Sequence, residues 1–150
     1  MKSPLSLDAK KAVLQTRYYD RRALSAISDS PTFKFTSVAW GKGYIELDES
    51  GRPYVGDIPV NVDSLEGEFF RNEPVLNYAN GITSIRATLP AGTVAEGDAK
   101  EFTTLLLLDD ESDDETGGDM GVVAVMVCLP VWVDENRSLV VEASLETNIA

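Results

Sequence analysis

Two apolar runs in the second half of the chain are its clearest structural signal. The first run is Leu105 to Leu108, and the second is Gly121 to Leu129, which is rich in β-branched valine. Both are much shorter than the ~20 apolar residues that span a bilayer, and short continuous apolar runs are typical of buried strands. The bridge between them, residues 109–119, has seven carboxylates, no basic residue and two adjacent glycines. We therefore expect a hairpin of two antiparallel core strands joined by a solvated acidic loop.

Alternating patterns and turn residues predict further strands. Asn80-Gly81 is a strong signal for a two-residue hairpin turn between Val75–Ala79 and Ile82–Leu89. Residues 44–74 contain six glycine and proline breakers, so we expect only short strand fragments there, such as 44–47. The other strands are expected at 33–40, 102–108, 122–133 and 139–145.

The N-terminal segment predicts a helix that precedes these strands. Ser6 can cap this helix, and helix-forming residues continue to about Ile27. Its apolar residues fall on two faces of a helical wheel, one with Leu14 and Tyr18 and the other with Leu24. A helix with two apolar faces can pack on the sheet with one face and on a neighbouring subunit with the other.

Together these elements predict a mainly β fold. We expect an N-terminal helix followed by an antiparallel β-sandwich or open barrel of about six strands. The chain shows no internal repeat and no linker, so residues 1–150 are expected to form a single domain that can bury an ordinary core.

The composition argues against an enzyme. Histidine is absent, which removes the commonest general base and most zinc and haem ligation. The one cysteine, Cys128, lies inside the second apolar run and is better interpreted as a buried core thiol than as a nucleophile. The carboxylates cluster in the bridge or stand singly, without the contrasting pair that a glycosidase needs. We expect no catalytic residue, no cofactor and no metal site.

The net charge of −12 is distributed unevenly. Residues 1–34 carry seven basic and three acidic side chains, whereas residues 35–150 carry six basic and twenty-two acidic ones. An acidic body repels nucleic acid and anionic lipid, so we expect neither nucleic acid nor a membrane as a partner. Arg17, Arg21 and Arg22 lie within about 140° of one another on a helical wheel. They can form one basic patch for an acidic neighbour, and the alternative is a solvated helix face.

The acidic bridge suggests cation binding, but it does not match the calcium loop of helix–loop–helix proteins. Counted from Asp109, the sixth position is Asp114, where that loop requires glycine, and the twelfth is Met120, where it requires glutamate. Weaker binding by clustered carboxylates remains as an alternative. In that alternative the chain is a soluble binding module whose loop 109–119 takes a divalent ion or a basic protein.

Four blocks of sequence resemble a known family. They are Phe35–Gly43, Ile85–Pro90, the pair Leu107–Asp110 and Val122–Val125, and Ser138–Ala143. In order and spacing they are similar to the tail-collar fibre family of contractile-tailed phages and related bacteriocins. In that family a helix leads into a strand and turn, followed by a proline-ended strand, a hairpin and a closing strand. The chain departs from the family at Lys42, where the family has an acid.

The resemblance implies a structural virion protein of a phage tail, either a baseplate component or an adaptor that holds tail fibres to the baseplate. Family members continue into a fibre shaft beyond the point where this chain ends, which suggests a shaftless adaptor or the attachment domain alone. The expected partners are the chain itself, as a trimer, and other tail, baseplate and fibre proteins. The expected location is the virion, after synthesis in the host bacterial cytoplasm. The candidate interface residues are Leu14, Arg17, Tyr18, Arg21, Arg22 and Leu24.

Overall fold

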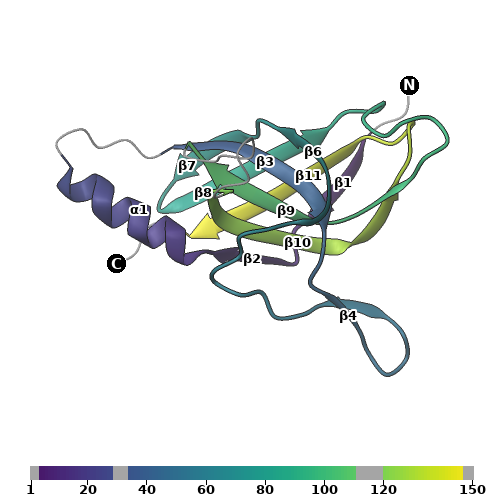
Figure 1. The fold of residues 1–150 in the computed structure, drawn as a ribbon, viewed down its shortest axis with the longest axis horizontal. Coiled ribbons are helices and arrows are strands. Elements are labelled where there is room, and N and C mark those ends of the chain that lie inside the picture. The colour runs from purple at the N-terminus through teal and green to yellow at the C-terminus, as the bar shows by residue number, and fades with distance from the viewer. Residues whose placement is uncertain (1–3, 29–33, 111–119, 147–150) are drawn as a thin grey trace.

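The computed structural model describes residues 4–28, 34–110 and 120–146, which form one helix and eleven strands (Figure 1). The helix is α1 (Thr16–Ile27). The strands are β1 (Leu5–Asp8), β2 (Lys11–Leu14), β3 (Phe35–Lys42), β4 (Ile45–Leu47), β5 (Pro53–Val55), β6 (Glu66–Asn72), β7 (Val75–Ala79), β8 (Ile82–Leu89), β9 (Lys100–Asp109), β10 (Val122–Val133) and β11 (Leu139–Glu146).

Two sheets form the body of the molecule and pack face to face. One sheet has the strand order β1-β11-β8-β7 and the other has the order β2-β10-β9-β3-β6, while β4 and β5 form a separate hairpin. The core between the sheets holds apolar side chains from both, among them Trp40, Leu89, Phe102 and Leu139. The rings of Trp40 and Phe102 lie 5.1 Å apart, centre to centre. The structure therefore confirms the predicted mainly β class and its sandwich form.

On each side of the sandwich the chain passes from one sheet to the other between two consecutive strands. On one side β1 pairs with β11, and the chain then passes to the other sheet, where β2 pairs with β10. The Ala9 amide donates to the Glu142 carbonyl and the Lys10 amide donates to the Val127 carbonyl, so the crossing residues bond to both sheets. On the other side β6 pairs with β3, and after Pro74 the chain continues as β7, which pairs with β8.

The central strands β9 and β10 are covered on both faces. One face contributes to the core between the sheets. The other face, with Leu106, Leu108, Val125 and Val127, packs under Val55 and the partly buried side chains of the chain between β4 and β6. A strand that is covered on both faces has a continuous apolar sequence, because the side chains on each face are shielded from water. This coverage explains the two runs that dominate the sequence.

The structure differs from the sequence-based expectation at the N-terminus. Residues 5–8 and 11–14 are strands, and the helix begins at Thr16 instead of near Ser6. The reason is tertiary, since these strands complete the edges beside β11 and β10. The structure also has more strands than the six expected, including β6 in the region expected to be least regular. In addition, β1 and β11 run parallel, whereas the expected sheet was antiparallel throughout.

Several local predictions are confirmed. The hairpin β7–β8 has its turn at Asn80-Gly81, with positive φ angles of 53° and 82° at these two residues. Strand β10 spans Val122–Val133, as predicted. Cys128 is buried, and burial raises the pKa of its thiol to about 11, which keeps the thiol protonated near neutral pH. In the part of the chain that the structure describes, no helix has both the length and the hydropathy needed to cross a membrane.

Candidate docking site at helix α1

A buried carboxylate at the end of β9 anchors helix α1. Asp109 has no exposed side-chain surface, and two arginines of the helix bind it. The Arg17 guanidinium donates to both carboxylate oxygens, through Nε to Oδ2 and through Nη2 to Oδ1 at 3.3 Å. Nη1 of Arg21 lies 3.0 Å from Oδ2, and Nη2 of Arg21 donates to Oδ1 of Asp110 at 3.0 Å. Two cations thus neutralise a charge that would be costly to bury alone.

This arrangement corrects the expectation that the whole bridge from residue 109 is solvated. Asp109 is the last residue of β9 and is fully buried. Its backbone amide donates to the carbonyl of Gly121, just before β10, at 2.9 Å. Asp110 is the first acidic residue that reaches the surface. The rest of the acidic stretch, residues 111–119, lies outside the described residues. The sequence signal for burial was the direct continuation of the leucine run into Asp109 without a turn residue.

A second set of contacts fixes the first turn of α1. Gln15, which precedes the helix, is 1% exposed. Its side-chain Oε1 accepts from the Val62 amide at 2.8 Å, and its Nε2 donates to the Pro59 carbonyl at 3.0 Å. The Thr16 amide donates to the Val60 carbonyl at 2.7 Å. The start of the helix is therefore tied to the segment that covers the outer face of the five-stranded sheet.

The inward face of α1 also contributes to the core. Tyr18 is 5% exposed, and its ring lies 6.1 Å from that of Phe35 on β3. The helix has no side-chain hydrogen bond at its N-cap, no acidic residue in its first turn and no basic residue in its last. Caps and dipole partners therefore add little, and the helix is held by packing and by the arginine–aspartate contacts.

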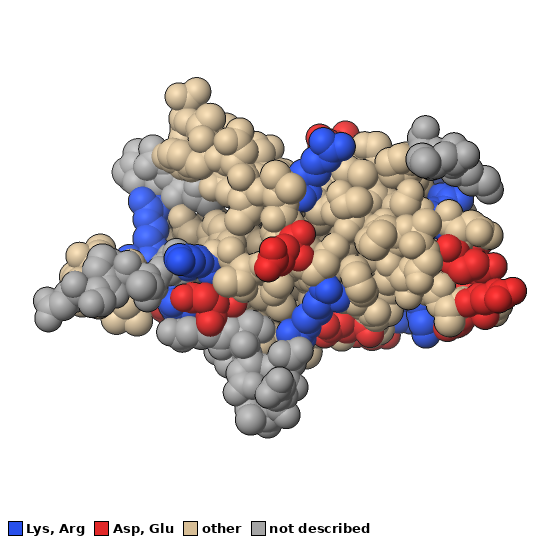
Figure 2. Space-filling model, turned by 90° about the horizontal axis from the view of Figure 1, so that it is seen from above, with Lys and Arg blue, Asp and Glu red and all other residues tan. Residues whose placement is uncertain are grey.

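The far end of α1 is exposed. The helix extends away from the strands at one end of the sandwich (Figure 1). Leu24 and Ile27, one turn apart, are 61% and 82% exposed, and Tyr19 is 43% exposed. Beside Leu24 a groove of about 430 Å³ lies between the helix and residues 60–62, with Leu24 and Val60 on its walls. Acidic and basic side chains stand close together near this end of the molecule (Figure 2).

The structure separates the six candidate interface residues into two groups. Arg17 and Arg21 bind Asp109 and Asp110 of the same chain, Tyr18 lies in the core, and Leu14 is half-buried in β2. Arg22 is half-buried and Leu24 is exposed. The three arginines therefore do not form one free patch, because two of them anchor the helix. Sequence reasoning missed the acceptor Asp109, and it did not select Ile27, the most exposed apolar residue of the helix.

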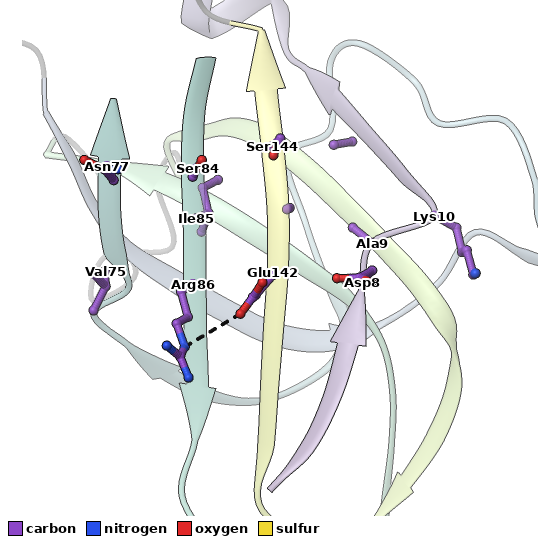
Figure 3. Close-up of a pocket in the computed structure, with 12 residues that line it drawn as sticks. Asp8, Ala9, Lys10, Val75, Asn77, Ser84, Ile85, Arg86, Glu142 and Ser144 are labelled. Carbon is purple, nitrogen blue, oxygen red and sulfur yellow. Dashed lines mark ion pairs between the residues drawn. The ribbon is translucent and has the colours of Figure 1, made fainter. Parts of the chain in front are cut away.

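A second hollow, of about 670 Å³, lies on the outer face of the four-stranded sheet, beside the crossing from β1 to β2 (Figure 3). Its lining is mostly polar, and Asp8, Lys10, Arg86 and Glu142 supply the charges. Nε of Arg86 and Oε1 of Glu142 lie 3.9 Å apart with both side chains more than half exposed, so this ion pair contributes little stability. Within the described ranges no three acidic or cysteine side chains converge as a metal site would require.

Comparison with known proteins places this β-rich chain in the class of phage tail fibre proteins. The family described as bacteriophage P1 tail fiber protein R matches residues 2–125, and the chain belongs to this family. The chain is 28% identical over 113 residues to tail fiber protein R of Escherichia phage P1, across 73% of this chain and 78% of that protein. No solved structure matches the chain. The expected resemblance to phage tail fibres is confirmed, and the protein has a structural role in a phage tail.

Proposed function

We propose that this tail protein is an adaptor that holds tail fibres to the baseplate, and that it docks through the exposed end of α1. The observation that carries the proposal is the contrast along this one helix. Its inward side is fixed by Asp109, Gln15 and Tyr18, whereas Leu24 and Ile27 stand in solvent. A helix that is already fixed loses little conformational freedom when its exposed side chains are buried by a partner.

The surroundings of these two residues suit a protein interface. Interfaces combine an apolar centre with a polar rim. Here Leu24, Ile27 and the wall residue Val60 supply the centre, and Asp20 and Arg22 supply charges on the same helix. In this proposal the helix is held in position from its inward side by Leu14, Arg17, Tyr18 and Arg21. Charge at the rim then selects the partner and its register.

The proposed partners are three copies of the chain around a common axis, together with fibre and baseplate proteins on either side. Residues 1–150 act in this proposal as a single attachment domain. A net charge of −12 disfavours nucleic acid and anionic membranes as partners. The location that follows is the tail of the assembled virion.

The test is the double variant Leu24→Asp/Ile27→Asp. We expect unchanged circular dichroism and thermal midpoint, a threefold lower mass in light scattering, and at least a tenfold loss of incorporation into phage particles. Leu47→Asp is the matched control, because Leu47 is 67% exposed on β4 and away from the helix. Incorporation of the folded double variant at the control's level would overturn the proposal.

A further inference from the structure

Strand β7 is an open edge of the four-stranded sheet. It stands last in the strand order, and among the described residues its ladder partner is β8 alone. All five residues from Val75 to Ala79 are exposed. Val75 and Tyr78 are 68% and 63% exposed, and Leu76 is 37% exposed. Apolar side chains on both faces of this edge therefore remain in solvent.

This edge lacks the features that usually prevent strand pairing. Exposed edges are commonly protected by charged side chains, by proline within the strand or by bulges. Strand β7 contains no charged residue and no proline, and its register with β8 is continuous over all five residues. The whole stretch 74–85 is uncharged. Among the described residues no second strand pairs with this edge, which leaves it open to another strand.

The absence of charge on β7 lets a second copy of the chain occupy this edge. Each copy carries a net charge of −12, so most pairs of surfaces on two copies repel one another. Pairing through the uncharged strand β7 avoids charges at the contact itself. A partner selected for opposite charge would instead require acidic or basic residues on β7, which has none.

The order of side chains in β7 suits pairing with itself. In an antiparallel pair related by a two-fold axis at Asn77, Leu76 lies opposite Tyr78 of the second copy, and Val75 lies opposite Ala79. An aliphatic side chain directly opposite an aromatic one stabilises such pairs. Leu76 and Tyr78 share one face of the sheet, with Ile85 and Thr83 as their neighbours on β8. Two-fold interfaces require this kind of self-complementarity.

We propose that two copies join through antiparallel pairing of their β7 strands, which merges two four-stranded sheets into one of eight strands. This contact does not involve α1. It doubles the number of copies in the assembly that forms through α1. One strand pair is a small interface. Association is therefore weak and depends on protein concentration.

The sharpest test is a single cysteine at the two-fold axis. Directly opposed residues of an antiparallel pair have Cα atoms about 4.5–5.5 Å apart, within the range that a disulfide spans. Asn77→Cys should therefore form a covalent dimer under mild oxidation. Ser84→Cys is the matched control, because Ser84 faces Asn77 in register on β8 and is also exposed. Its copies would lie about three strand spacings apart, roughly 14 Å, and should not cross-link. The native Cys128 is buried and does not compete.

A second measurement uses charge at the same edge. Leu76→Lys/Tyr78→Lys should halve the mass seen by light scattering and abolish cross-linking of Asn77→Cys, with no change in circular dichroism. The α1 variant Leu24→Asp/Ile27→Asp should leave the cross-link intact, which separates this contact from the helix contact. Equal cross-linking at positions 77 and 84, or an unchanged mass in the lysine variant, would overturn the proposal.

Discussion

The hairpins β9–β10 and β7–β8 share one motif and differ in what covers them. From Phe102 to Asp109 every residue of β9 is buried, whereas every residue of β7 is exposed. The first hairpin lies in the middle of its sheet, between the core and the covering chain from β4 to β6. The second forms the edge of its sheet, and β8 alternates between buried and exposed residues. One hairpin holds the sandwich together, and the other presents a surface.

This difference shows how the chain divides stability from contact with partners. Buried apolar area is the main favourable term in folding, and β9 and β10 hold much of it. Strand β7 and the end of α1 can therefore change with little cost to the fold. Substitutions in each of these regions test that division.

The largest effect should come from Asp109, the one acidic residue that is buried in the described part of the core hairpin. Asp109→Ala leaves Arg17 and Arg21 without their shared acceptor in a buried site, and we expect a loss of about 3–5 kcal/mol in the free energy of unfolding. Asp110→Ala, one residue further on, removes an exposed partner and should cost less than about 1 kcal/mol. Urea unfolding of both variants measures the difference. Equal losses would mean that burial of Asp109 does not matter.

Truncation of an apolar side chain should separate the two hairpins directly. Leu106→Ala opens a cavity in a site with no exposed surface, and we expect a loss of about 2–5 kcal/mol. Val75→Ala on β7 removes a side chain that is already 68% exposed, and the change should stay within about 0.5 kcal/mol. Thermal and urea unfolding at one protein concentration give both values. Similar losses at the two sites would contradict the division.

The turn of the exposed hairpin should show a smaller, backbone effect. Gly81 has a φ of 82°, and a residue with a Cβ in this region costs about 1–2 kcal/mol. We therefore expect Gly81→Ala to lower the unfolding free energy by about that amount. Asn80→Gly is the control, because glycine accepts the positive φ of 53° at that position. A loss in Asn80→Gly as large as that in Gly81→Ala would exclude the backbone explanation.

The smallest effect should be a pH dependence at Asp110. Partial burial opposes its ionisation, but hydrogen bonds and the charge of Arg21 outweigh burial, so the pKa of Asp110 is lowered. A lowered pKa in the folded state contributes stability that is present above the unfolded value of about 3.9 and is lost as the pH falls through the folded pKa. Asp110→Asn should therefore differ from the wild type at pH 7 and match it in strong acid. A difference that persists in acid would contradict the ionic contribution.

The features that the sequence predicted depend on local chemistry. Continuous and alternating apolar patterns located β10 and β8, because burial on two faces or one leaves a direct trace in residue order. Asn80-Gly81 predicted its turn because both residues accept positive φ. The single cysteine within an apolar run predicted a buried thiol, and Cys128 is 1% exposed.

Only the tertiary structure decided the features that depend on partners distant in sequence. Residues 5–14 have a helix-compatible pattern, yet β11 and β10 offer backbone edges that bind them as strands. Asp109 sits in a sequence of carboxylates, yet Arg17 and Arg21, about ninety residues earlier, make its burial possible. The exposure of Leu24 follows from where α1 meets the sheets. Hydrophobic pattern and turn chemistry thus determined which segments form the core, while long-range pairing of backbone and charge determined which residues remain for partners.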